Sequence, residues 1–318
     1  VRSMSHLLSP KLKLSAIALV FTLSSVVQAA NDDIEQEFDV SSGGTLVIDS
    51  DAGAIKVESW GRDQVLVRVM NTDGFEVKVV QEGDSISVTA ESEGLGFFGS
   101  RRSNISFRVS VPTQYNVELD TGGVAIDVAE LSGNVTVDTS GGSIQIGKIS
   151  GGDVKADTSG GSIDIQDVDG DVEADTSGGR ITIGNVTGDV IADTSGGAIV
   201  IGNVQGDMYA NTSGGNIDVG QGAGRVELDT SGGTIRAGWA LGPIIVDTSG
   251  GNIVLEGSET SVKADTSGGN ITVEKSNGPV DADTSGGSIT IRKSVGPIRA
   301  DTNGGRIDAE LVLSDGPR

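Results

Sequence analysis

The residue that this sequence repeats most regularly, and that can take part in chemistry, is aspartate. It opens the pentapeptide Asp-Thr-Ser-Gly-Gly, which recurs along most of the chain. The copies begin at Asp138, Asp157, Asp175, Asp193, Asn211 (with Asn in place of Asp), Asp229, Asp247, Asp265 and Asp283, and degenerate copies begin at Asp120 and Asp301. Regularly placed carboxylates suit Ca²⁺, and an asymmetric pair can serve as the acid and base of a glycosidase.

Composition excludes most other catalytic and metal-binding chemistry. The chain has no cysteine, and its one histidine, His6, lies in the expected leader peptide. Thiol nucleophiles, histidine bases, disulfides and ordinary zinc sites are therefore absent from the mature sequence. The sequence predicts no catalytic residue and no cofactor. Ca²⁺ is the one metal ion whose binding remains possible with the side chains that the mature sequence contains.

The spacing of the motif identifies the element that must position these carboxylates. Successive copies are 18 residues apart, except that 19 residues separate Asp138 from Asp157. A strict period of this length indicates one structural unit stacked many times. When each unit is numbered from its Asp, position 7 is always Ile, and positions 9, 16 and 18 are apolar. Since side chains alternate along a strand, each unit contains two short strands, each with one apolar face.

The two strands of a unit must close on each other at two corners. The Gly pair at positions 4 and 5 provides one bend, and a turn around position 14 provides the other. The sequence thus predicts an all-β fold, a single-chain β-solenoid (β-helix) of about ten 18-residue rungs with an irregular β N-terminal cap. A single rung buries too little apolar surface to fold alone, so its stability must come from its neighbours.

The same alternation predicts the direction of the polar side chains in the motif. Thr at position 2 points inward, and Asp at position 1 points outward. Outward carboxylates stacked about 5 Å apart repel one another, so something must compensate. One hypothesis is that each Asp accepts hydrogen bonds from the amides of its own turn. The other is that Ca²⁺ bridges neighbouring rungs along Asp138, Asp157, Asp175 and Asp193, helped by a second acidic column at position 15.

Places where the repeat fails are the candidate ligand contacts. The loop from Glu91 to Ser103 carries Phe97, Phe98, Arg101 and Arg102; the alternative is a hairpin whose phenylalanines fold back on the cap. Trp239 stands where position 12 changes from Leu, Ile or Val to Gly, Ala and Ser, and it either covers this step or contacts a ligand. Tyr209 is an outward aromatic residue at position 17, in a small apolar patch with Ile191 and Ile245.

The chain is expected to begin with a leader. An apolar run from Leu14 to Val27 follows basic residues and ends in a signal-peptidase pattern, which predicts a signal peptide over residues 1–29. Residues 30–119 are expected to form the N-terminal β cap, with a degenerate repeat at Asp49–Val57. Strands are expected within it at Gln64–Met70, Phe75–Val80, Ser85–Ala90 and Asn104–Val111. Residues 120–310 are expected to form the regular β-solenoid, and residues 311–318 a C-terminal cap or tail.

Three sequence features resemble a known family. They are the repeated Thr-Ser-Gly-Gly-x-Ile-x-Ile, the Gly-x-Val-x-Ala half-rung, and the segment from Gly53 to Trp60. They resemble the bacterial putative-adhesin family of β-strand-repeat proteins, a domain of unknown function related to head GIN domains. Val111-Pro112, before the first regular rung, is similar to that family as well. The resemblance extends from about residue 31 to the end. It implies an exported, surface-associated β-solenoid and supplies no catalytic residue.

These observations favour a non-enzymatic exported protein, adhesin-like or a scaffold, that presents a stacked β surface to a cell-envelope, polysaccharide or protein partner. It would be periplasmic, cell-surface-associated or secreted, with no transmembrane segment in the mature chain. A net charge of −23, nearer about −26 without the leader, opposes binding to nucleic acid. Two alternatives remain: a glycan-acting β-helix enzyme that uses carboxylates, and a self-assembling structural solenoid.

Overall fold

The computed structural model of the protein describes residues 33–93 and 104–312. The predicted signal peptide and the loop residues Phe97, Phe98, Arg101 and Arg102 lie outside these ranges. All regular elements in the described residues are β-strands. The same ranges contain no helix long and apolar enough to cross a membrane. The predicted all-β class is therefore confirmed.

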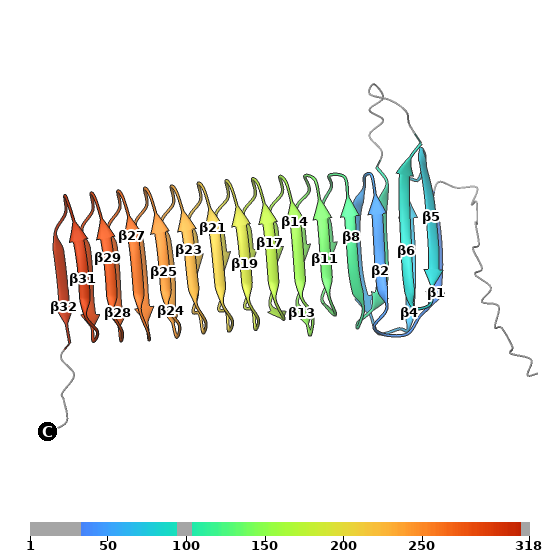
Figure 1. The fold of residues 1–318 in the computed structure, drawn as a ribbon. Helices are drawn as coiled ribbons and strands as arrows, with labels where there is room; N and C mark the ends of the chain where they lie inside the picture. Colours follow the sequence, from blue (N-terminus) through green and yellow to red (C-terminus); the bar gives the residue numbers. More distant parts are fainter. Residues whose placement is uncertain (1–32, 94–103, 313–318) are drawn as a thin grey trace, which may run out of the picture.

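Most strands belong to two sheets that face each other and extend along the whole stack (Figure 1). Sheet A has 15 strands. In spatial order they are β1 (Ile34–Asp39), β4 (Gln64–Met70), β7 (Ser106–Pro112), β3 (Ala54–Trp60), β9 (Ile126–Val128), β12 (Ile144–Ile146), β15 (Ile163–Ile165), β18 (Ile181–Ile183), β20 (Ile199–Ile201), β22 (Ile217–Val219), β24 (Ile235–Ala240), β26 (Ile253–Ser258), β28 (Ile271–Ser276), β30 (Ile289–Ser294) and β32 (Ile307–Leu311).

Sheet B has 14 strands, and a short sheet C of three strands forms part of one corner. Sheet B consists of β31 (Ile298–Thr302), β29 (Val280–Thr284), β27 (Val262–Thr266), β25 (Ile244–Thr248), β23 (Val226–Thr230), β21 (Met208–Thr212), β19 (Val190–Thr194), β17 (Val172–Thr176), β14 (Val154–Thr158), β11 (Val135–Thr139), β8 (Asn116–Thr121), β2 (Thr45–Ser50), β6 (Ser85–Ser92) and β5 (Phe75–Glu82). Sheet C consists of β10 (Leu131–Ser132), β13 (Ile149–Ser150) and β16 (Val168–Asp169).

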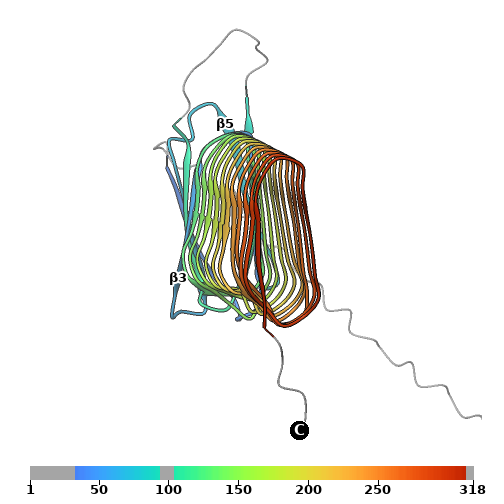
Figure 2. The same ribbon diagram turned by 90° about the vertical axis from the view of Figure 1, so that its left-hand side faces the viewer.

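Successive rungs pair in parallel with identical positions in register, which makes a flattened tube when seen along its axis (Figure 2). Ile181 of position 7, for example, pairs with Ile163 on one side and Ile199 on the other. From Ile126 to Ile289 every position-7 Ile is at most 1% exposed. Because each rung has the same inward set, the core is a series of apolar columns that run along the axis. The predicted β-solenoid with an 18-residue repeat is confirmed.

The position-2 threonines lie inside the tube, as predicted. From Thr139 to Thr284 these side chains are buried, and each hydroxyl donates to a backbone carbonyl of the preceding rung while accepting the N–H of the second motif glycine. In one rung, Thr194 Oγ1 donates to the Gly179 carbonyl at 3.0 Å and accepts from the Gly197 amide at 3.3 Å. One hydroxyl therefore satisfies a donor and an acceptor of two consecutive turns.

The opposite corner changes shape along the stack. In the early rungs a Gly at position 10 often separates the sheet A strand from the position-12 residue, which pairs in sheet C or in isolated bridges such as Val186 with Val204. From β24 to β30 the strand runs without a break to position 12, where Ser258, Ser276 and Ser294 are 0% exposed. The predicted transition from large to small corner residues is present, and it coincides with the lengthening of sheet A strands from three residues to six.

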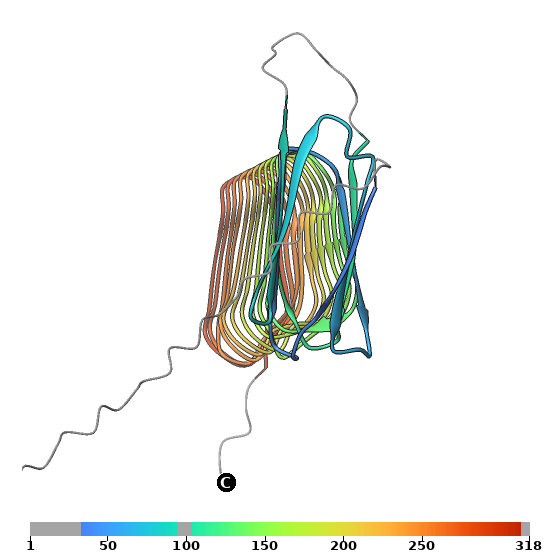
Figure 3. The same ribbon diagram turned by 90° about the vertical axis from the view of Figure 1, so that its right-hand side faces the viewer.

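At the N-terminal end, where blue and teal strands cover the end of the tube (Figure 3), spatial order departs from chain order (Figure 1). Asp49 pairs with Asp120 and Ile55 with Ile126, so β2 and β3 form a true rung, as the degenerate repeat predicts. The next rung outward is β6 and β7, which pair in parallel with β2 and β3 although they follow them in sequence. Antiparallel strands β4, β1 and β5 lie outside this rung. The four strands predicted in this region are all present.

Tyr115 ties this N-terminal region to the regular stack. Its side chain is fully buried, and its hydroxyl donates to the backbone carbonyl of Asp84, in the turn between β5 and β6. Burial, and then the charge of Asp84, raises the pKa of Tyr115 to about 12. The neutral phenol is thus favoured in the folded state.

We expect this tyrosine to limit stability at alkaline pH. A raised folded-state pKa contributes stability that is complete below the unfolded value of about 10 and is lost as pH rises toward 12. Tyr115→Phe should therefore flatten the fall in stability between pH 10 and 12, while costing about 1 kcal/mol at neutral pH through the lost hydrogen bond. Urea unfolding of both proteins across this pH range measures the difference. An equally steep alkaline fall in the variant would contradict it.

Candidate functional site

The motif aspartates form a ladder on the outer face of sheet B. In-register pairing joins Asp157 to Asp138 and Asp175, and the series continues through Asn211 to Asp301. Every one of these side chains is half-buried or exposed, so the predicted outward direction is confirmed. We call this series column 1, and we name the other outward columns by their position in the rung.

The turn amides do not bind the column 1 carboxylates, so the hypothesis that Asp caps its own turn is wrong. In the regular rungs from Asp138 to Arg306, which the structure describes completely, the second motif glycine donates its N–H to Thr. The pairs are Gly142–Thr139, Gly161–Thr158, Gly179–Thr176, Gly197–Thr194, Gly215–Thr212, Gly233–Thr230, Gly251–Thr248, Gly269–Thr266, Gly287–Thr284 and Gly305–Thr302. The inward Thr is on the side of the strand that faces this amide, whereas Asp projects from the opposite side.

The carboxylates of column 1 consequently repel one another and destabilise the folded stack. Partial burial, with repulsion from Asp247 and Glu227 as the next cause, raises the pKa of Asp229. Partial burial is also the largest cause that raises the pKa of Asp120, Asp157 and Asp193. Position-17 lysines offset the repulsion locally: Lys263 Nζ lies 3.2 Å from Asp265 Oδ2.

Removing one charge from this ladder should stabilise the protein at neutral pH. A raised carboxyl pKa favours the protonated form in the folded state, so its contribution is complete below the unfolded pKa and is lost as pH rises through the folded one. Mild acidification from pH 7 should therefore raise the melting temperature, and Asp229→Asn should raise it at pH 7 and weaken this pH dependence. High salt should shrink the gain, since these groups are partly exposed. A lower melting temperature for Asp229→Asn at pH 7 would show that the carboxylate has a stabilising partner.

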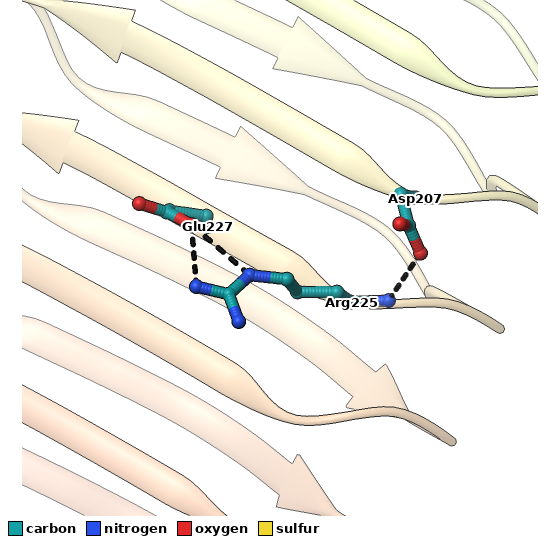
Figure 4. A network of polar contacts seen from close by, with 3 residues as sticks. All are labelled: Asp207, Arg225 and Glu227. Carbon is teal, nitrogen blue, oxygen red and sulfur yellow. Dashed lines mark hydrogen bonds and ion pairs between the residues drawn. The ribbon is translucent and has the colours of Figure 1, made fainter.

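The acidic column at position 15 has a different role, which the sequence reasoning missed. Each Asp accepts the backbone N–H of the residue one rung further along: Asp153 from Asp171 (2.9 Å), Asp171 from Asp189 (2.8 Å), Asp189 from Asp207 (2.7 Å) and Asp207 from Arg225 (2.8 Å). The ladder ends at Arg225, whose side chain accepts nothing and instead binds Glu227 Oε2 at 2.8 Å (Figure 4). The next residue in the column is Pro243, which has no N–H to satisfy. The change from Asp to Pro in the sequence was the available signal.

A similar ladder occupies position 11. The side-chain oxygens of Asp167, Asn185 and Asn203 accept the amides of Asn185, Asn203 and Gln221. Many polar side chains on the outer faces therefore serve the backbone of the neighbouring rung. Among the described residues, no group of three or more acidic side chains is arranged to hold a metal ion. The Ca²⁺ hypothesis for Asp138, Asp157, Asp175 and Asp193 remains untested by this geometry, and melting temperatures with excess Ca²⁺ and with chelator would test it.

Trp239 lies in the position-11 column in register with Gly257, and Gly257 in turn with Lys275. The indole covers Gly257, which has φ of 130° and is buried. Lys275 Nζ lies 5.0 Å from the centre of the ring, close enough for a cation–π interaction. The ring thus has Gly257 as a neighbour and a lysine above it, an arrangement that supports the interpretation that Trp239 covers the step.

Of the two candidate contacts that the structure describes, Tyr209 has the more open side chain. It lies on β21 in register between Ile191 and Glu227, and 37% of its surface is exposed, against 47% for Ile191. Partial burial and the charges of Asp193, Asp229 and Glu227 raise the pKa of Tyr209. Tyr209 therefore has carboxylates on both neighbouring strands. Tyr209 and Trp239 belong to different sheets, so the structure does not bring them into one site.

The sequence matches no protein-family model and no curated protein. Solved structures similar to the chain include a putative adhesin from Parabacteroides distasonis (13% identity, 88% of this chain and 98% of that chain, TM-score 0.30). A putative adhesin from Bacteroides fragilis (11% identity, 87% and 97%, TM-score 0.26) is another. A third is a putative lipid binding protein from Parabacteroides distasonis (14% identity, 89% and 96%, TM-score 0.22). Two of these names agree with the family resemblance of the sequence, but similarity this low carries no argument about function.

Proposed function

We propose that this protein is a non-enzymatic, exported, adhesin-like scaffold whose outer strand faces bind a cell-envelope, polysaccharide or protein partner. The observation that carries the proposal is the contrast between inside and outside. Inward positions repeat almost without change, whereas the outward column at position 17 carries Lys155, Glu173, Ile191, Tyr209, Glu227 and Ile245 in successive rungs. A rigid stack with a variable exterior presents many different contact surfaces on one framework.

A glycan-acting enzyme is a weaker candidate. An active site needs an asymmetric cluster in a cleft, whereas the carboxylates of column 1 recur in nearly every rung. The surface hollows found among the described residues are troughs between outward columns, such as one of about 460 Å³ lined by Asp127, Gln145 and Asp164.

The proposed function is tested by binding of the mature protein to fractionated cell envelope, an array of polysaccharides and immobilised envelope proteins. Saturable binding to one of these fractions, without turnover of the bound material, is the expected result. Release of shortened glycan would favour the enzyme instead, and absence of binding to every fraction would count against the scaffold role.

Self-association is a second candidate, favoured by the last described rung. Within the described residues β31 and β32 pair on one side only, with β29 and β30. Ile307, Leu311 and Val312 are 43%, 50% and 39% exposed, whereas the equivalent Ile289 is fully buried. Unpaired strand edges with apolar side chains promote association. Light scattering should then show a mass that rises with protein concentration, and a constant monomer mass would remove this candidate.

A further inference from the structure

Two departures from the repeat coincide in one rung, on the outer face of sheet B. Among the described rungs, Asn211 is the one residue of column 1 from Asp120 to Asp301 that is not Asp. In the same strand, Tyr209 is the one aromatic residue of column 17 in the regular stack that the structure covers. The two side chains lie two positions apart on β21 and so project from the same face. Asn211 replaces a carboxylate of column 1 with an amide, and Tyr209 places an uncharged aromatic ring beside it in the variable column 17.

We call the surface formed by Tyr209 and Asn211 the uncharged surface. The preceding rung extends it, and the following rung ends it. Ile191 precedes Tyr209 in column 17, and Asp193 pairs in register with Asn211 in column 1. Ile191 also borders a hollow of about 440 Å³ whose other walls include Asp171, Asp189 and Glu173. On the far side, Arg225 reaches across the face to Glu227, with Nε and Nη2 at 3.1 and 2.8 Å from Oε2 (Figure 4). This ion pair marks where the uncharged surface ends.

We propose that Ile191, Tyr209 and Asn211 form a binding site for an uncharged glycan chain. The proposal rests on the proposed function and names the partner class of that scaffold. An exposed tyrosine offers a rigid amphipathic ring at low entropic cost, against which the apolar face of a sugar can pack. The amide of Asn211 and the carboxylates around it supply donors and acceptors for hydroxyl groups. The hollow beside Ile191 gives the chain room to continue along the stack.

The charge around Tyr209 and the small size of its apolar patch favour an uncharged glycan over an anionic polymer or a folded protein. Tyr209 is in register with Glu227, and the strands on either side of β21 carry Asp193 and Asp229, so an anionic polymer would be repelled. A stable protein interface buries about 800 Å² on each partner around an apolar centre. Here the adjoining apolar side chains in register are Ile191 and Tyr209, since Glu227 separates them from Ile245. A patch of this kind suits a sugar chain better than a folded protein.

The test uses the fact that the chain has two tyrosines, of which Tyr115 is fully buried. Protein labelled with 3-fluorotyrosine should give two fluorine resonances, and Tyr209→Phe identifies the one from Tyr209. Titration with cellohexaose or chitohexaose should shift that resonance, and hexagalacturonate should not. Tyr209→Ala should weaken the better of the two uncharged ligands at least about tenfold in calorimetry. Tyr209→Phe, which keeps the ring, should bind nearly as well.

Ile245→Ala is the matched control, because Ile245 is another apolar residue of column 17 and lies beyond the Arg225–Glu227 pair. It should bind like the unsubstituted protein, and unchanged urea midpoints should show that all variants are folded. Glycan binding that survives Tyr209→Ala would overturn the site while leaving the scaffold function in place. So would binding to envelope material with no shift at Tyr209 for either uncharged probe. Equal binding of hexagalacturonate would overturn the preference for uncharged chains, and a lack of binding to any envelope fraction would overturn the scaffold function as well.

Discussion

Gly197→Ala is expected to destabilise the rung around it by at least about 3 kcal/mol. Gly197 is the second glycine of its motif, at a corner where consecutive rungs approach closely. A Cβ atom there would overlap the backbone carbonyl of Gly179 in the preceding rung and would lie 2.8 Å from the amide nitrogen of Arg180. Backbone cannot move aside without breaking the parallel ladder on which the stack depends, so the methyl group must push the two turns apart.

The adjacent glycine provides the control. A Cβ on Gly196 would have the Gly178 carbonyl oxygen as its nearest neighbour, at 3.6 Å, which is ordinary van der Waals contact. Gly196→Ala should therefore change stability by less than about 1 kcal/mol, even though both residues belong to the same repeated Gly-Gly pair. Urea unfolding compares the two variants. Hydrogen exchange of the amides in neighbouring rungs shows whether the damage is local, since long repeat arrays can unfold in parts. Equal effects of the two substitutions would contradict the steric explanation.

Thr194→Val is expected to cost about 2–3 kcal/mol, although the two side chains have nearly the same shape. The hydroxyl donates to the Gly179 carbonyl and accepts from the Gly197 amide, and the side chain is only 6% exposed. Valine would leave both backbone groups without a partner at a buried corner. That loss is larger than the small gain from replacing a hydroxyl with a methyl group.

Two variants separate this effect from simple packing. Thr194→Ser keeps the hydroxyl and removes one methyl group, so it should cost about 1 kcal/mol, close to the value for a single buried methylene. Thr182→Val, on the outer face of β18, should be nearly neutral. Unfolding midpoints in urea measure all three. If Thr194→Val proved as stable as Thr194→Ser, the hydroxyl would not be the group that supports the turn.

At this same corner the sequence determines some features of the turn and leaves others to the folded structure. Period and alternation alone predict two strands per rung, an inward Thr, an outward Asp and a bend at Gly-Gly, because side-chain direction depends only on position along a strand. They do not predict which of two neighbouring polar groups accepts the turn amide. The acceptor depends on where the amide points once the rung has closed. The amide of Gly197 donates to Thr194 rather than to Asp193.

At the candidate site, too, the sequence predicts the direction of the side chains, and the folded structure decides which of them are neighbours. The sequence identified Tyr209 and Ile191 as outward residues, since their parity opposes that of the core. The register of the sheets decided that they adjoin each other and Asn211, and that Arg225 and Glu227 bound them on one side. Trp239, equally prominent in the sequence, is placed over Gly257 and under Lys275 by the same register.

The sequence by itself therefore determined the repeat, the two strand faces and the composition of the core. The faces follow from the alternation of side chains along each strand, and the 18-residue period indicates rungs that are stable only when they are stacked. The tertiary structure decided the partners across rungs. Asp153 and Asp157 illustrate this, since both are outward aspartates of adjacent repeats. Asp153 accepts the amide of Asp171 one rung away, whereas Asp157 faces like charges, with Lys155 Nζ 3.8 Å away. Their roles differ because hydrogen bonding and repulsion act between residues 18 positions apart, which become neighbours only when the chain winds into its solenoid.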